Sequence, residues 1–127
     1  MKIRKASAKD WPRVRRLIKE HAHVLLQKHL PKPQEFFVAI ENGEVVGCCA
    51  LVLYSKRLSE IRSLAVAKKH QRKGIATLLI DACVASAKKR GVEELIAITG
   101  AEKLFAKHRF STFRGEKFAL LKSLKPK

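Results

Sequence analysis

A short basic turn at residues 71–77 combines the residue types that can hold an anion at the start of a helix. The turn reads QRKGIAT, with two cations before Gly74. An apolar stretch that predicts a strand over residues 59–66 precedes it, and helical spacing follows over residues 74–90. The first amides of a helix have no partners and carry partial positive charge, and a glycine lets a ligand approach the backbone closely. We therefore expect this turn to bind a phosphate or a pyrophosphate.

Two charged side chains lie on the strand that leads into the turn. Glu60 and Arg62 are two residues apart, so they share one face of the strand with Leu64 and Val66 unless a bulge breaks the alternation. A carboxylate that points into a cleft can take a proton from an amine. An exposed Glu60 paired with Arg57 or Arg62 explains the same pattern, so the sequence leaves both interpretations open.

The charge of the chain favours anionic partners. Its 127 residues include 28 Lys and Arg against 11 Asp and Glu, which gives a net charge of +17. Such a surface attracts polyanions. The basic residues are scattered, however, and aromatic residues make up only 6% of the chain, so no base-stacking surface is indicated. A phosphorylated small molecule is therefore favoured over nucleic acid as the partner.

Several classes of protein are disfavoured by the sequence. No apolar run approaches the roughly 20 residues that span a membrane, and the N-terminus has no apolar signal core. We therefore expect a cytoplasmic protein without a membrane partner. We also expect no metal, because the cysteines and the clustered histidines lack ligand spacing. These residues are Cys48, Cys49, Cys83, His21, His23 and His29. The cysteines are expected to be reduced and buried, with Cys48 and Cys49 on opposite strand faces.

The order of elements predicts one α/β (α+β) domain over residues 1–127. We expect strands at residues 2–6, 35–41, 45–54, 59–66, 94–99, 110–113 and 117–121, and helices at 11–21, 24–29, 74–90 and 101–108. Asn42-Gly43 is typical of a hairpin turn, and Gly91 of the residue after a helix. The order β-αα-βββ-α-β-α-ββ describes a mixed, mainly antiparallel sheet flanked by helices, with the 45–54 strand at its centre.

The segment LAVAKKHQRKGIATLL resembles the acyl-CoA-binding signature of the GNAT superfamily of N-acetyltransferases. That signature is Gln/Arg-x-x-Gly-x-Gly/Ala between a strand and a helix, and it stands here as residues 71–76. The element order also fits the GNAT fold. The segments VVGCCAL, SEIRSLAV and TGAEKLFAKHRF look like the acetyltransferase domain of N-acetylglutamate synthases and their stand-alone relatives.

The resemblance implies acetyl-CoA as co-substrate, without a metal. The backbone of Leu64, Ala65 and Val66 would pair with the pantetheine arm, which requires a splay between this strand and the 94–99 strand. The amides of the turn would hold the pyrophosphate, and those residues are Gln71, Arg72, Lys73, Gly74, Ile75, Ala76 and Thr77. A solvated basic turn is the alternative role of Arg72 and Lys73.

The resemblance also suggests roles at the reacting end. Glu60 matches a position used as general base, and the Val66 amide would polarise the acetyl carbonyl. Arg62 would orient a substrate carboxylate, with a structural ion pair as the alternative. Two departures stand out. Phe105 occupies the place of a Tyr that often protonates the CoA thiolate. Arg109 replaces a glycine, so a left-handed backbone there would be strained.

The resemblance therefore implies an acetyl-CoA-dependent N-acetyltransferase that moves an acetyl group directly to a primary amine of a small molecule or amino acid. The alternatives are a protein N-acetyltransferase and a non-catalytic CoA-binding or RNA-associated protein. The acceptor and the oligomeric state stay open, a homodimer included. We further expect solvated positions for His70 and His108, and an apolar helix stripe of Ile75, Leu78, Leu79, Ala82 and Cys83.

Overall fold

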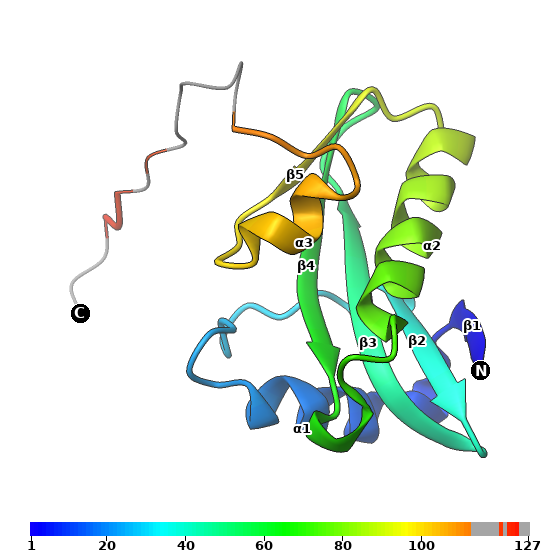
Figure 1. The fold of residues 1–127 in the computed structure, drawn as a ribbon. Helices are drawn as coiled ribbons and strands as arrows, with labels where there is room; N and C mark the ends of the chain where they lie inside the picture. The colour runs from blue at the N-terminus through cyan, green and yellow to red at the C-terminus, as the bar shows by residue number, and fades with distance from the viewer. Residues whose placement is uncertain (113–119, 121, 125–127) are drawn as a thin grey trace.

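The computed structural model describes residues 1–112, 120 and 122–124 of the chain. Its main elements are β1 (Lys2–Lys5), α1 (Trp11–Glu20), β2 (Phe36–Glu41), β3 (Glu44–Leu53), β4 (Leu58–Val66), α2 (Ile75–Lys89), β5 (Glu94–Ala97) and α3 (Glu102–Ala106). The strands form one sheet in the order β1-β2-β3-β4-β5, antiparallel except for the parallel pair β4–β5 (Figure 1). The predicted mixed, mainly antiparallel sheet is confirmed.

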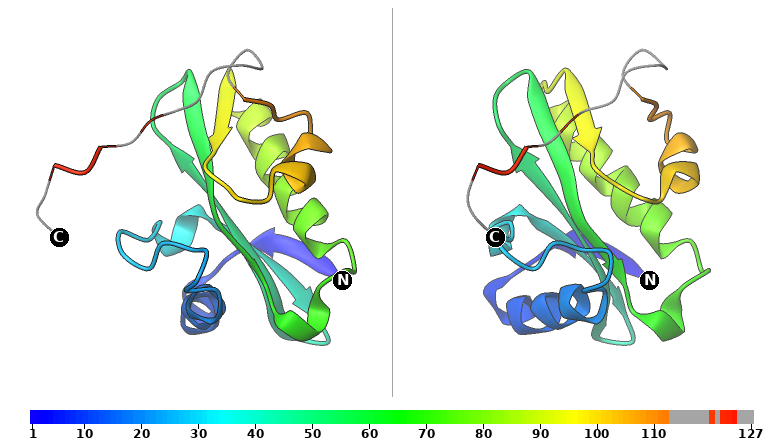
Figure 2. Two further views of the ribbon diagram at one scale, coloured as in Figure 1. Left: turned by 60° about the vertical axis from the view of Figure 1, so that its left-hand side comes forward. Right: turned by 90° about the vertical axis from the view of Figure 1, so that its left-hand side faces the viewer.

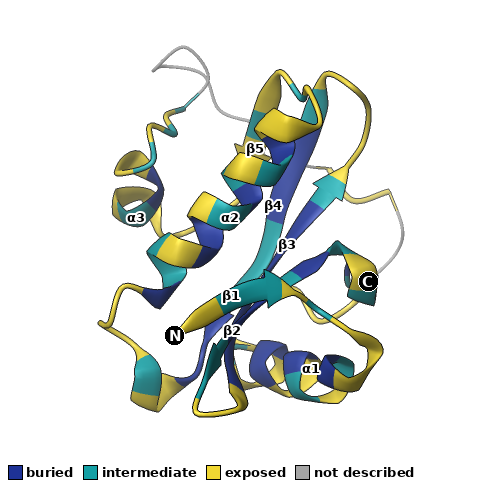
Figure 3. Cartoon of the chain, turned by 90° about the vertical axis from the view of Figure 1, so that its right-hand side faces the viewer, coloured by how far each residue is buried: buried dark blue, intermediate teal, exposed yellow. Residues whose placement is uncertain are grey.

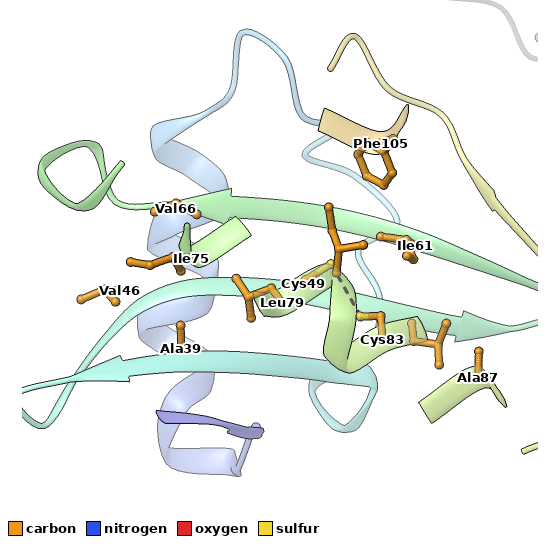
Figure 4. Packing of buried hydrophobic residues seen from close by; sticks show 12 residues of the cluster. Ala39, Val46, Cys49, Ile61, Val66, Ile75, Leu79, Cys83, Ala87 and Phe105 are labelled. Carbon is orange, nitrogen blue, oxygen red and sulfur yellow. Dashed lines mark hydrogen bonds between the residues drawn. The ribbon is translucent and has the colours of Figure 1, made fainter. Parts of the chain in front are cut away.

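Helices cover both faces of this sheet. Helix α1 lies on one face, and α2 and α3 lie on the other (Figure 2), with the buried residues of α1 and α2 turned toward the strands (Figure 3). On the α1 side the Trp11 ring lies 5.6 Å from the Phe36 ring, centroid to centroid. On the α2 side an apolar cluster joins the sheet to α2 and to Phe105 of α3 (Figure 4). Residues 45–51 of β3 contribute to both clusters, which confirms the predicted central strand.

The predicted turn residues adopt the expected backbone conformations. Asn42 and Gly43 have φ angles of 50° and 78° between β2 and β3. Both values suit the tight hairpin whose twist matches the strands. Gly74 and Gly91 flank α2 with φ angles of 80° and 75°. The hairpin and both ends of α2 are therefore set by residues that tolerate a left-handed backbone.

A bulge in β4 changes which side chains share a face. Ser63 has a φ of 54°, and the β3–β4 register shifts by one residue beside it. As a result Leu64 and Val66 face α2, while Glu60 and Arg62 face the α1 side. The prediction that all four side chains share one face is wrong, because one extra residue reverses the alternation.

The helix expected at residues 24–29 is absent from the described chain, which forms turns and bends there. Gln27 Nε2 donates to the carbonyl of Ile18 at 3.0 Å and to that of Leu25 at 2.9 Å. Because this side chain satisfies a carbonyl at the end of α1, it closes the helix. His29, with a φ of 55°, is also incompatible with a right-handed helix. One α-helix, not two, therefore separates β1 from β2.

Two apolar assignments also differ from the expectation. Leu78 is exposed and Ile80 is buried, so the apolar stripe of α2 is rotated by one residue toward positions 75, 79, 80, 83 and 87. The strand expected over 94–99 ends at Ala97, and both Ile96 and Ile98 are exposed, because β5 is the edge of the described sheet.

The last two strands of the expected order fall at the end of the chain. Residues 110–112 form no strand. Residues 113–119 and 121 of the expected pair lie outside the described residues.

Candidate functional site

Strand β4 has an open edge over its second half. It pairs with β5 only from Leu58 to Ile61, and it continues to Val66 with β3 as its only described neighbour (Figure 1). The predicted splay between the two strands is therefore present. The amide of Ala67 donates to the Val46 carbonyl at 2.8 Å. By strand alternation, the backbone groups of Val66 then point away from β3, into the splay.

The turn after β4 leads directly into the start of α2. Gln71 Nε2 donates to the Val66 carbonyl at 3.2 Å, which fixes the turn against the end of β4. Arg72 and Gly74 both have a left-handed backbone, with φ angles of 66° and 80°. The Leu78 amide donates a hydrogen bond to the Gly74 carbonyl at 3.2 Å, which is the first bond of the helical pattern in α2. The three helical amides before it, at residues 75–77, have no partner within the helix.

The electrostatics of this turn suit an anion. The N-cap residue of α2 is Gly74, which has no side chain. No capping side chain at that position therefore competes with a ligand for the helix start. Arg72 and Lys73 are exposed beside it and form no ion pair with another described residue. The helix dipole and these two cations all favour a negative charge at one place.

Glu60 is a buried carboxylate on the α1 side of β4. It is 8% exposed, and it accepts a hydrogen bond from the hydroxyl of Tyr54, which is 54% exposed. Partial burial and this bond raise the pKa of Tyr54. The ion pair considered as the alternative for Glu60 is not formed, because Arg57 pairs with Glu94 and Arg62 donates to the His29 carbonyl at 3.2 Å.

Sequence reasoning missed Tyr54, because this residue lies at the end of the predicted apolar strand over residues 45–54. The register of the β3–β4 hairpin explains its contact with Glu60. Val52 pairs with Glu60 across the hairpin, and Tyr54 follows Val52 on the same strand face. A polar ring two residues from the partner of an inward carboxylate can reach that carboxylate diagonally.

The segment between α1 and β2 touches β4 at two points. His21 Nε2 lies 3.0 Å from the Val66 carbonyl, and the His29 carbonyl accepts from Arg62. Arg62 is half-buried there. This segment therefore forms a wall beside Glu60, Arg62 and the open edge of β4. The contact made by His21 was also missed, since nothing in the sequence pairs it with residue 66.

Helix α3 departs from the family pattern as expected at two positions. Phe105 is buried, its ring stacks edge-on to that of Phe110 at 5.2 Å, and it offers no proton. Arg109 has a φ of 66°. The Phe110 amide donates to the Phe105 carbonyl and the Arg109 amide to the Ala106 carbonyl, at 3.2 and 3.0 Å. This bonding closes the helix around a left-handed residue, which is the strained turn that the sequence predicted.

Two histidines are less solvated than expected. The His108 side chain is only 9% exposed, and its Nδ1 lies 3.1 Å from Asp81 of α2. The half-buried His70 lies 3.1 Å from Glu41. Each ring joins two elements, so the expected solvated positions are wrong.

The cysteines are structural. Cys48 and Cys49 face opposite sides of β3, and Cys49 Sγ lies 3.7 Å from Cys83 Sγ of α2 (Figure 4). Burial raises the pKa of Cys48 to about 12, so its thiolate is not available as a nucleophile. Within the described ranges, no three His, Cys, Asp or Glu side chains are placed to hold a metal ion. No described helix is long and apolar enough to cross a membrane.

Comparison with known proteins identifies the family that shares this arrangement of strands, turn and helix. The model of the acetyltransferase (GNAT) family matches residues 2–111. An uncharacterized N-acetyltransferase of Chlorobaculum tepidum is 38% identical over 85 residues, which cover 67% of this chain and 55% of that protein. The chain thus spans about half the length of this curated relative.

Two solved structures share the fold. A Mycobacterium tuberculosis protein in complex with CoA and a second ligand superposes with a TM-score of 0.84 at 30% identity, over 89% of this chain and 73% of that one. N-acetylglutamate synthase from Neisseria gonorrhoeae, complexed with coenzyme A and N-acetyl-glutamate, gives a TM-score of 0.75 at 27% identity. It is matched over 84% of this chain and 27% of its own length. Both the predicted fold and the predicted resemblance to these synthases are confirmed.

Proposed function

Because the chain belongs to the acetyltransferase (GNAT) family, we propose that it moves an acetyl group directly from acetyl-CoA to a primary amine. The observation that carries this proposal is the continuity of two features. The open edge of β4 ends at Val66, and the amides at residues 75–77, which have no partner within α2, lie one turn further along the chain. An extended arm that ends in a pyrophosphate matches both features, and the solved relatives named above bind CoA.

The proposed donor site uses backbone more than side chains. The backbone of Leu64, Ala65 and Val66 adds the pantetheine arm as an extra strand along the open edge of β4. The turn holds the pyrophosphate through its amides, with Thr77 and the charges of Arg72 and Lys73. The Val66 amide points into the splay and stabilises the oxyanion that forms on the acetyl carbonyl.

Glu60 is the proposed general base. A neutral amine nitrogen attacks the thioester carbonyl, so a C–N bond forms and the C–S bond breaks. Glu60 takes the proton that the nitrogen loses, and Tyr54 positions this carboxylate through its hydroxyl. Since Phe105 has no proton to give, the CoA thiolate is protonated by solvent.

The proposed acceptor is an amino acid or another small amine with a carboxylate. Arg62 lies half-buried on the same strand face as Glu60, where a guanidinium can hold a carboxylate in a fixed orientation. The Neisseria gonorrhoeae relative is complexed with N-acetyl-glutamate, an acetylated amino acid. This relative supports the acceptor class and leaves the individual acceptor to experiment.

The donor site is tested with two matched glycine substitutions. Gly74→Ala and Gly91→Ala each place a methyl in open space at a left-handed residue, one at each end of α2. Both should cost about 1 kcal/mol of folding stability. Only Gly74→Ala should weaken acetyl-CoA binding, by about tenfold or more, because it blocks the approach to a charged ligand. Equal affinities of the two variants, measured by calorimetry, would refute the proposed pyrophosphate position.

The base is tested by turnover. Acetyl-CoA consumption is first screened against amino acids, polyamines and acidic peptides. With the best acceptor, Glu60→Gln should lower kcat about 10²- to 10⁴-fold and leave acetyl-CoA affinity unchanged. Glu44→Gln removes an exposed carboxylate and serves as the control. An undiminished kcat in the Glu60 variant contradicts the assignment.

A non-catalytic CoA-binding protein is the second candidate, and the buried Phe105 favours it. Tight acetyl-CoA binding without turnover of any acceptor in the screen would support this second candidate.

A further inference from the structure

A groove lies along the outer side of α1. It encloses about 570 Å³. Seven residues of α1 and of the segment after it line the groove: Pro12, Arg15, Arg16, Lys19, Ala22, Gln27 and Leu30. None of them belongs to the turn at residues 71–77 or to the Glu60 site. The proposed acetyl transfer therefore assigns no role to the residues that line the groove.

The amphipathic pattern of α1 gives this groove its charge. The helix buries Val14, Leu17 and Ile18 against the sheet, which leaves its cations on the outside. Those that line the groove, Arg15, Arg16 and Lys19, are exposed, and none forms an ion pair with a described residue. The lining contains no acidic side chain.

The lining of the groove also has apolar members. Pro12, Ala22 and Leu30 line the groove together with the cations, and Gln27 is held in place by its bond to the end of α1. Sites for single-stranded nucleic acid use aromatic side chains for base stacking, and the lining has none. A lining that combines apolar side chains with positive charge instead suits a polypeptide that alternates carboxylates with apolar side chains.

We propose that this groove binds an acidic segment of a partner polypeptide. The cations pair with its carboxylates, and the apolar lining residues contact the side chains between them. The net charge of +17 speeds the encounter with such a partner. The proposal concerns binding alone, so it stands or falls independently of acetyl transfer.

The segment between α1 and β2 both lines the groove and contacts β4 beside the candidate site. Ala22, Gln27 and Leu30 line the groove, while His21 and His29 of the same segment contact β4. A peptide in the groove should therefore shift the amide resonances of this segment as well as those of α1. That pattern distinguishes the groove from other basic parts of the surface.

The test uses a ten-residue peptide of alternating Glu and Leu and two charge-matched triple variants of the full chain. The variant Arg15→Glu/Arg16→Glu/Lys19→Glu reverses the charge of the groove. The control, Lys56→Glu/Lys103→Glu/Lys107→Glu, makes the same change in net charge at exposed lysines elsewhere. Arg15→Gln/Arg16→Gln/Lys19→Gln is a milder groove variant in case the reversal disturbs folding.

Three lost surface contacts should weaken peptide binding about tenfold in both groove variants, and much less in the control. Amide shifts of the wild-type chain should map to α1 and residues 22–30. Equal losses in groove and control variants would overturn the proposal, as would the absence of any binding. A ten-nucleotide RNA that occupies the groove more tightly than the peptide at equal salt would also overturn it, in favour of a nucleic-acid partner.

Discussion

The Asp10 carboxylate ties β1 to the start of α1, and its removal should destabilise the fold in a pH-dependent way. Arg4 donates to it through Nη1 at 2.7 Å and Nη2 at 3.1 Å, and the Ser7 amide donates at 2.7 Å. The hydrogen bonds from Arg4 come first among the causes that lower the pKa of Asp10 from 3.8 to about 2. Helix α1 carries the groove and leads into the wall of the candidate site, so this anchor supports both.

The size of the effect follows from the pKa shift. At about 1.36 kcal/mol per unit, the shift is equivalent to at most about 2.4 kcal/mol of stability. The Arg4 side chain is 37% exposed, so water screens the pair and about 1 to 2 kcal/mol is expected. Because the folded-state pKa is lowered, this stability is present above about pH 4 and is lost as the pH falls toward about 2.

Urea denaturation of Asp10→Asn and wild type measures this difference. The variant should be less stable by about 1 to 2 kcal/mol at neutral pH, and the gap should fall to about half near pH 3. Glu44→Gln, which removes an exposed carboxylate, should show neither change. A gap that does not change with pH, or an Asp10 carboxyl that titrates near 3.8 by NMR, would falsify the reasoning.

Two further substitutions test the backbone and packing arguments. Arg109→Gly should raise the free energy of unfolding by about 0.5 to 1 kcal/mol, because glycine relieves the left-handed strain while adding entropy to the unfolded chain; an unchanged melting temperature contradicts this. Gly47→Ala should lower stability by about 1 to 3 kcal/mol, because its methyl would lie 3.1 Å from side-chain carbons of both Ile75 and Leu79. Wild-type stability in that variant would show that α2 moves away without cost.

Local backbone chemistry made much of this fold predictable. Asn42-Gly43, Gly74 and Gly91 each mark a left-handed position, so the hairpin and both ends of α2 could be located from residue type alone. The anion turn was predictable for the same reason, since it depends on a helix start and a glycine. The strain at Arg109 was predictable because an arginine stands where the family pattern has a glycine at the end of a helix.

The remaining features depend on contacts between distant residues. The bulge at Ser63 has no glycine or proline to mark it, yet it decides which side chains join Glu60 on the α1 side. The hydrogen bond of Tyr54 to Glu60 depends on the register across the hairpin. The end of α1 is set by the folded-back side chain of Gln27, where helical spacing alone predicts a second helix.

The central claim is that acetyl-CoA lies along the open edge of β4 with its pyrophosphate in the turn at residues 71–77. An acetyl-CoA titration followed by backbone amide resonances tests this most directly. The claim predicts large shifts at Val66 and at residues 71–77, and slowed exchange of the amides at 75–77. Shifts confined to other parts of the chain, or none at saturating acetyl-CoA, would contradict it.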